Sequence, residues 1–260
     1  MDAWAQQLDR VAQEHGFVIT KVILTHWHHD HVGGVDDVLR LARDRWHRGS
    51  GSSDAAAAAG QVEIYKAPDA EHDAGLPPGV RPLADGAVVA VPGATLRAVT
   101  TPGHTDDHVC LLLEEEGALF AGDMVLGQGT TVFTNLRTYM ASLRKAHALQ
   151  PAVLYPGHGP VVADATAKLH EYWSHRHTRE QQIVARLAEA GRPQTIPELV
   201  AVIYAAYPVE LHLPAQHSVA QHLGKLLEEG RVRRLPAATA DEDDRWQLVV
   251  DAGRPPAAAL

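Results

Sequence analysis

One short segment constrains this chain more than any other: residues 25–31, which read THWHHDH and directly follow a short apolar run. Six consecutive residues of this segment contain four side chains able to bind a metal ion: those of His26, His28, Asp30 and His31. So many polar groups beside a buried strand are costly to bury unless something binds them. Alternation along an extended chain puts His26 and His28 on one side. The turn that follows can bring Asp30 and His31 to a second centre, so the segment predicts a site for two metal ions.

Three further candidate ligands occupy the same kind of place, a loop directly after a strand-like run. They are His104 in TPGH at 101–104, Asp123 in AGD at 121–123 and His158 in YPGH at 155–158. Ligands on loops at strand ends, held by a buried sheet, form a rigid site that stays open to substrate. His29 is expected to point away from the metals. Seven other histidines are interpreted as ordinary surface or core residues: His15, His47, His72, His147, His170, His175 and His177.

Short apolar runs of β type, separated by Pro-Gly and acidic turns, predict an α/β fold with a sheet-rich core. The expected strands cover residues 17–24, 87–91, 95–100, 109–113, 118–121 and 152–155. Apolar residues at helical spacing before residue 16 and over 32–45 predict two helices. The segment 48–60, RGSGSSDAAAAAG, is low in complexity and is expected to be a solvated insertion.

The last third of the chain changes character and predicts a small winged-helix domain. Two capping boxes, each before an apolar helical stripe, indicate helix starts: Thr178 with Gln181, and Thr195 with Glu198. A third helix and two short strands follow, and three helices closed by a hairpin are the outline of a winged helix. The expected division is a first domain at 1–163, a linker helix at 164–177, the winged helix at 178–250 and a disordered tail at 251–260.

Composition limits the classes of function. The formal charge of −9 argues against indiscriminate binding of polyanions. No run of about eighteen apolar residues is present, so the sequence indicates no membrane span, and the first residues do not resemble a targeting leader. The single cysteine, Cys110, lies in an apolar run and is expected to be a buried structural thiol. The lack of an intrachain disulfide favours a reducing compartment, the cytoplasm or the mitochondrial matrix.

The seven candidate metal ligands resemble the ligand pattern of the metallo-β-lactamase fold hydrolases, whose αββα fold carries two metal ions. The resemblance implies a first metal on His26, His28 and His104, a second on Asp30, His31 and His158, and Asp123 as the bridge. It also implies catalytic roles for Asp30, as proton acceptor, and for Asp123. This nitrogen and oxygen ligand set suits two Zn²⁺ ions, with manganese or iron as alternatives. Such a pair activates water and stabilises a developing oxyanion.

Within these hydrolases, the chain most resembles the β-lactamase-like protein 2 family, whose animal members are single-strand-selective endoribonucleases of the mitochondrial matrix. The likeness rests on TPGHTDDH at 101–108, GDMVLGQGTTVF at 122–133, YPGHGPV at 155–161, HRHTREQQI at 175–183 and HLGKLLEEGRV at 222–232. It implies an endoribonuclease with single-stranded RNA as partner. Family members begin with strands before the first helix seen here, so the resemblance also implies that N-terminal strands of the fold are missing and that the chain has an open sheet edge.

Fungal lactamase-type thioesterases, which release polyketides from acyl carrier protein, share the same two-part plan. The alternative function is therefore a thioesterase with an acyl carrier protein partner, and a non-catalytic binding module is a third possibility. The stretch 175–235 carries eight Lys or Arg against six Asp or Glu. If RNA is the substrate, Arg231, Arg233 and Arg234 are expected to contact its phosphates. The competing interpretation is that these arginines are solubilising charges.

Overall fold

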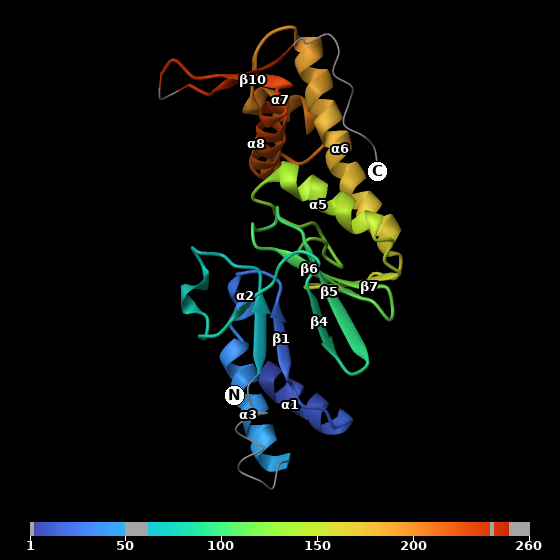
Figure 1. Cartoon of the computed structure of the whole chain (residues 1–260). Coiled ribbons are helices and arrows are strands. Elements are labelled where there is room, and N and C mark those ends of the chain that lie inside the picture. Colours follow the sequence, from blue (N-terminus) through green and yellow to red (C-terminus); the bar gives the residue numbers. More distant parts are fainter. Residues whose placement is uncertain (1–2, 50–61, 240–241, 250–260) are drawn as a thin grey trace.

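A computed structural model of the chain describes residues 3–49, 62–239 and 242–249. Figure 1 shows an α/β part, blue to green, and a helical part, orange to red, joined by the long helix α6. The α/β part contains two separate sheets of three and five strands. Within the described ranges no helix is long and apolar enough to cross a membrane.

The three-stranded sheet is parallel and has the order β1-β2-β3. Its strands and neighbouring helices are α1 (Ala3–His15), β1 (Lys21–Leu24), α2 (His29–Val32), α3 (Val35–Gly49), β2 (Glu63–Lys66), the 3-10 helix η1 (Asp73–Gly75) and β3 (Arg81–Pro82). Leu24, Val35 and Ile64 are buried together and tie α3 to the sheet. The expected strand at 17–24 is confirmed only from residue 21, because Phe17 and Val18 are exposed.

The five-stranded sheet has the order β4-β5-β6-β7-β8 and is antiparallel except for the parallel pair β7–β8. Its strands are β4 (Val88–Val91), β5 (Ala94–Thr100), β6 (Val109–Leu113), β7 (Ala118–Gly122) and β8 (Val153–Pro156). All five were predicted within two residues. Helix α5 (Leu136–Ala148), which pattern analysis does not include, packs its buried face with α6 into the main core. Cys110 is fully buried in that core, as expected.

Helix α6 (Ala165–Ala190) is continuous over 26 residues, so the predicted helix at 164–177 is present but does not end at residue 177, and the capping box predicted at Thr178 is wrong. Its first turn is capped by the side chain of Asp164. The physical reason is a single buried stripe whose two apolar ends serve two cores. Its N-terminal half contributes Leu169 and Tyr172 to the main core, and its C-terminal half contributes Ile183 to the core of the helical part. A break near residue 178 would expose both faces.

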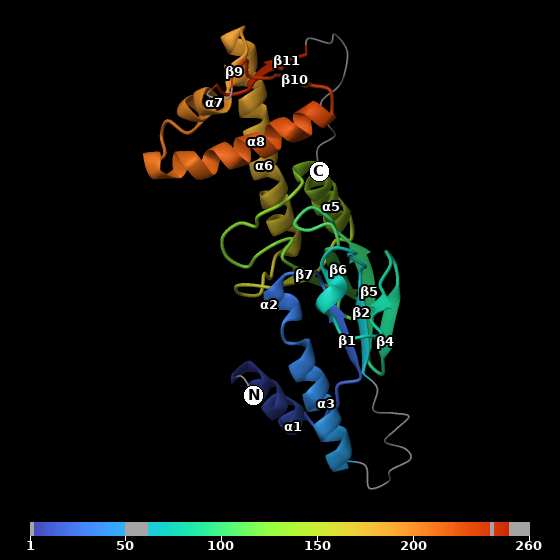
Figure 2. The same cartoon turned by 90° about the vertical axis from the view of Figure 1, so that its left-hand side faces the viewer.

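The helical part has the expected winged-helix outline (Figure 2). Its elements are β9 (Gln194–Thr195), α7 (Ile196–Ile203), the 3-10 helix η2 (Val209–Leu211), α8 (His212–Glu228), β10 (Val232–Leu235) and β11 (Arg245–Leu248). The predicted capping box at Thr195 and Glu198 is confirmed, and β11 pairs with β9 as well as β10. Of the low-complexity segment, only residues 48 and 49, at the end of α3, lie in the described residues; the rest, and the tail at 251–260, lie outside them.

Candidate metal centre

The candidate ligands lie on loops that leave the carboxyl ends of four strands, β1, β5, β7 and β8. Strands β5 and β7 both run antiparallel to β6, and β8 runs parallel to β7. The carboxyl ends of β5, β7 and β8 therefore lie at the same end of the larger sheet. At this end of the sheet Val109 N donates to Thr25 O at 2.9 Å, which joins the end of β1 to the larger sheet. The two sheets therefore bring sequence-distant loops to one place.

All seven predicted ligands meet there, in two adjoining groups. The first contains His26, His28, His104 and Asp123, and the second Asp30, His31 and His158. Within each group, one ligand atom per residue lies within 4.8 Å of the others. His29 belongs to neither group, as expected, and its ring lies against Gly33.

Asp123 lies between the two groups. Its Oδ2 is 3.8 Å from His104 Nε2 and 3.4 Å from His158 Nε2. Its Oδ1 is buried without a well-aligned hydrogen bond, with His31 Nε2 3.3 Å away. A buried carboxylate in this state normally binds a cation. This position suits a ligand shared by two metal ions.

The converging imidazoles support the same interpretation. His28 Nδ1 lies 3.0 Å from His26 Nε2 and 3.1 Å from His104 Nε2. Three ring nitrogens directed at one point cannot all donate to one another, but they suit a bound cation. With Asp30 Oδ2 3.1 Å from His158 Nε2, the His/Asp cluster is suited to a di-metal site.

Neighbouring groups fix which ring nitrogen faces the site. His104 Nδ1 is 2.7 Å from the carbonyl oxygen of Val132, which leaves Nε2 for a metal. Thr131 Oγ1 donates to Asp123 O at 2.6 Å, so one loop orients two ligands. Such outer contacts hold ligand rings in their binding orientation. Gly157 is required nearby, because a Cβ there would lie 2.5 Å from Asp123 Oδ1.

The protonation states of three ligands, His26, His28 and Asp123, are those that a metal requires. Burial, followed by repulsion from His108 and other histidines, lowers the pKa of His26 to about 2. Burial also lowers the pKa of His28. Burial would raise the pKa of Asp123, but its contact with the nearby His31 imidazole holds that pKa at about 2. At neutral pH the site therefore offers neutral imidazoles at His26 and His28 and an ionised carboxylate at Asp123, whereas, against the effect of burial, Asp123 raises the pKa of His31.

Two residues of the site escaped prediction from the sequence. His108 is fully buried beneath Asp123, and its Nε2 accepts from Asp123 N at 3.0 Å while Nδ1 faces Thr101 Oγ1 at 2.8 Å. The only signal was its place in TPGHTDDH. His72, interpreted as an ordinary residue, stacks on Trp27 at 3.8 Å between centroids and 8° between planes.

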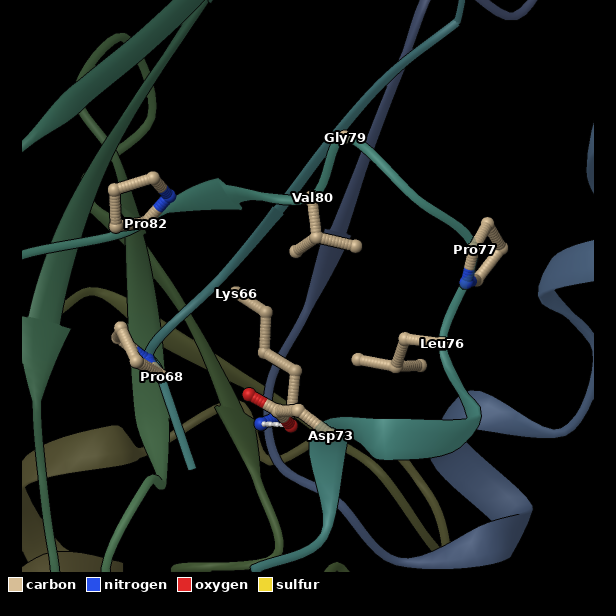
Figure 3. A pocket seen from close by; sticks show the side chains of 8 residues that line it. All are labelled: Lys66, Pro68, Asp73, Leu76, Pro77, Gly79, Val80 and Pro82. Carbon is tan, nitrogen blue, oxygen red and sulfur yellow. Dashed lines mark ion pairs between the residues drawn. The ribbon is translucent and has the colours of Figure 1, made fainter. Parts of the chain in front are cut away.

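A cavity of about 350 Å³ opens beside the ligands, with Trp27, His72 and Thr105 in its wall. Its acidic lining consists of Asp69, Glu71, Asp106 and Asp107. A second cavity of about 310 Å³ shares Pro68 with the first and is walled by Leu76, Pro77, Val80 and Pro82, with Lys66 and Asp73 at one side (Figure 3).

Comparison with known proteins gives two family matches. Residues 3–158 match the metallo-beta-lactamase superfamily and residues 195–246 the beta-lactamase associated winged helix domain. A beta-lactamase-like protein 2 homolog of Caenorhabditis elegans is 40% identical over 214 residues, covering 82% of this chain and 67% of that protein. An atrochrysone carboxyl ACP thioesterase of Aspergillus fumigatus is 38% identical, covering 80% of this chain and 63% of that protein. The thioesterase pkgB of Emericella nidulans is 44% identical over 71% of this chain and 47% of that protein.

Solved structures share the fold over nearly the whole chain. A beta-lactamase domain protein from Burkholderia ambifaria superposes with a TM-score of 0.69 at 22% identity, covering 96% of this chain and 80% of that one. A metallo-beta-lactamase family protein from Thermus thermophilus superposes with a TM-score of 0.60 at 25% identity, covering 96% of this chain and 87% of that one.

Proposed function

Since this chain belongs to the metallo-beta-lactamase superfamily and carries the associated winged helix domain, we propose that it is a di-zinc hydrolase of acyl thioesters. Two zinc ions held by the seven ligands would activate water and polarise the substrate carbonyl. The attack breaks the C–S bond and forms a C–O bond, so thioester and water give a carboxylic acid and a thiol. Relatives named as thioesterases support this choice of substrate.

The chain's own residues provide the rest of the chemistry. Asp30 is on the open side of the centre, with a side chain 59% exposed and Oδ2 3.1 Å from His158 Nε2. It can accept the proton that water loses and return it to the thiolate. Asp123 stays ionised between the two groups, and His108 beneath it holds its backbone N–H. The geometry is fixed before substrate arrives.

The observation that carries the thioester proposal is the acidic cavity beside the ligands. Asp69, Glu71 and Asp106 line it, whereas its described lining contains no lysine or arginine. A polyanionic strand needs cations along its path, and carboxylates repel it. The reacting part of a thioester is neutral and suffers no such repulsion.

The test is a side-by-side assay of the zinc-loaded protein on hexanoyl-N-acetylcysteamine and on single-stranded RNA. We expect about two zinc ions per chain, because seven ligands exceed the needs of one tetrahedral ion. We expect Asp123→Ala to lose both ions and thioester hydrolysis, and Asp36→Ala, a change at an exposed residue of α3, to retain them. One zinc ion or fewer in the wild type, with activity unaffected by chelators, would contradict the proposal.

Cleavage of single-stranded RNA is the second candidate. Trp27 in the cavity wall favours it, because aromatic rings stack on bases. The predicted contacts of the wing arginines with RNA phosphates give this candidate less support. Arg231 donates to Glu180 at 2.7 Å, Arg233 to Gln247 at 2.6 Å, and Arg234 pairs with Asp244, so each has a partner within the winged helix.

The RNA candidate has its own test. If the wing holds RNA, Arg233→Gln with Arg234→Gln should lower affinity and flatten its salt dependence. Arg231 is left unchanged because it forms an ion pair with the buried side chain of Glu180, and its loss would disturb the fold. Faster turnover of RNA than of thioester would favour the nuclease. A mitochondrial location belongs to that alternative and stays a prediction.

A further inference from the structure

Lys66 is a buried lysine that the hydrolytic chemistry does not use. It ends β2, its side chain is 1% exposed, and its Nζ lies 2.6 Å from Asp73 Oδ1 (Figure 3) and 2.7 Å from Asp107 Oδ2. Nζ also donates to Ala67 O at 3.0 Å. A buried ammonium is tolerated only with partners of this kind. Although burial lowers it, the pKa of Lys66 is raised by Asp107 and then Asp73, so the group is charged.

The two carboxylates come from different walls of the site. Asp107 belongs to the loop that carries His104, and its Oδ1 accepts from Thr105 Oγ1 at 2.7 Å. Asp73 belongs to segment 67–77, which runs from the end of β2 through η1. Lys66 thus joins that segment to a metal-ligand loop.

Segment 67–77 is braced internally, and Asp73 is its ion-pair contact with Lys66, while Ala67 and Leu76 pack against apolar clusters at its two ends. Asp73 Oδ2 accepts from Asp69 N at 2.7 Å. Asp69 Oδ1 in turn accepts from Glu71 N at 3.0 Å and His72 N at 3.1 Å. These bonds place the His72 ring flat on Trp27, which adjoins the ligands His26 and His28. The part of the cavity wall that Asp69, Glu71 and His72 form is therefore linked to Asp73 through these bonds.

We propose that Lys66 is a positioning residue for substrate: it locks segment 67–77 against the loop of His104, so that His72 and Trp27 form the wall that the acyl group contacts. This inference rests on the proposed thioesterase function. The ammonium acts through the segment and touches neither the ligands nor the reacting atoms. A purely structural ion pair would change stability alone, whereas a positioning residue changes substrate affinity.

Asp73→Asn is the informative variant, because Lys66→Met would leave two carboxylates without their cation and endanger folding. Asp73→Asn keeps the Lys66–Asp107 pair, and Asp73 is 28% exposed, so the fold is expected to survive. Glu114→Gln is the matched control. It removes an ion pair between Arg97 on β5 and Glu114, which follows β6, and neither residue lines either of the two cavities described above.

Three measurements are made on the zinc-loaded full chain: kinetics with hexanoyl-N-acetylcysteamine, binding of its thioether analogue, and amide hydrogen exchange over 67–77. For Asp73→Asn we expect KM and the analogue Kd to rise about tenfold, the size of one charge-assisted hydrogen bond, with kcat and zinc content unchanged. Exchange over 67–77 should accelerate, and Glu114→Gln should match the wild type throughout.

Unchanged KM and analogue Kd in Asp73→Asn, with faster exchange, would show that the anchor is structural only and overturn the inference. Tight analogue binding by a wild type that hydrolyses no thioester would instead overturn the proposed function. In that case weaker binding by Asp73→Asn would still support the role of Lys66.

Discussion

The winged helix should be sensitive to acid because of one buried histidine. His222 on α8 is 2% exposed, and its Nδ1 has no hydrogen-bond partner among the described residues. Burial, followed by repulsion from Lys225, Arg176 and Arg179, lowers the pKa of His222 to about 3. The folded protein therefore keeps this imidazole neutral in mildly acidic solution.

The magnitude follows from linkage. The ordinary pKa of histidine is 6.5, so below pH 6.5 the unfolded chain binds a proton at His222 that the folded chain does not bind until about pH 3. A folded-state pKa below the unfolded value means that stability is lost as pH falls through this window. Each pH unit fully inside the window is worth about 1.4 kcal/mol, which gives a loss of about 2 kcal/mol between about pH 7 and 5.

The assay compares urea unfolding of wild type and His222→Leu at pH 7 and pH 5. Leucine removes a buried unpaired polar atom and keeps an apolar side chain, so the variant should fold. Its stability should fall less on acidification than that of the wild type, by about 2 kcal/mol, and the contributions of other histidines cancel in the comparison. His217→Leu, at an exposed position of the same helix, is the control. Equal losses in His222→Leu and wild type would refute the reasoning.

Two further predictions concern stability and metal affinity. Glu180→Gln should lower the free energy of unfolding by about 3 kcal/mol, because Lys225 and Arg231 are then left with Glu229 as their shared carboxylate partner. Thermal unfolding should show this loss with zinc content unchanged. An unaltered melting temperature would contradict the prediction. Thr131→Val removes the hydrogen bond to Asp123 O and should weaken zinc binding about tenfold in chelator competition, whereas unchanged affinity would show that this loop does not orient the ligand.

Local chemistry in the sequence determined much of this protein. The H-x-H-x-D-H segment and the Pro-Gly-His loops identify candidate ligands, because so many coordinating groups after buried strands have few other uses. Strands of the larger sheet and the capping box at Thr195 were predictable because each depends on neighbours within a few residues. Helix α5 was not predicted, although its sequence carries a comparable local signal, an Asn135 cap before apolar residues at helical spacing.

Only the tertiary structure decided the features that depend on residues far apart in the chain. Helix α6 is unbroken because two separate cores bury opposite halves of its stripe, which no local capping pattern reveals. His108 supports Asp123, and Lys66 joins Asp73 to Asp107, through contacts between loops that lack sequence periodicity. The free energy of such buried polar groups depends on which partners the fold brings to them, and those partners are decided by packing rather than by neighbours in sequence.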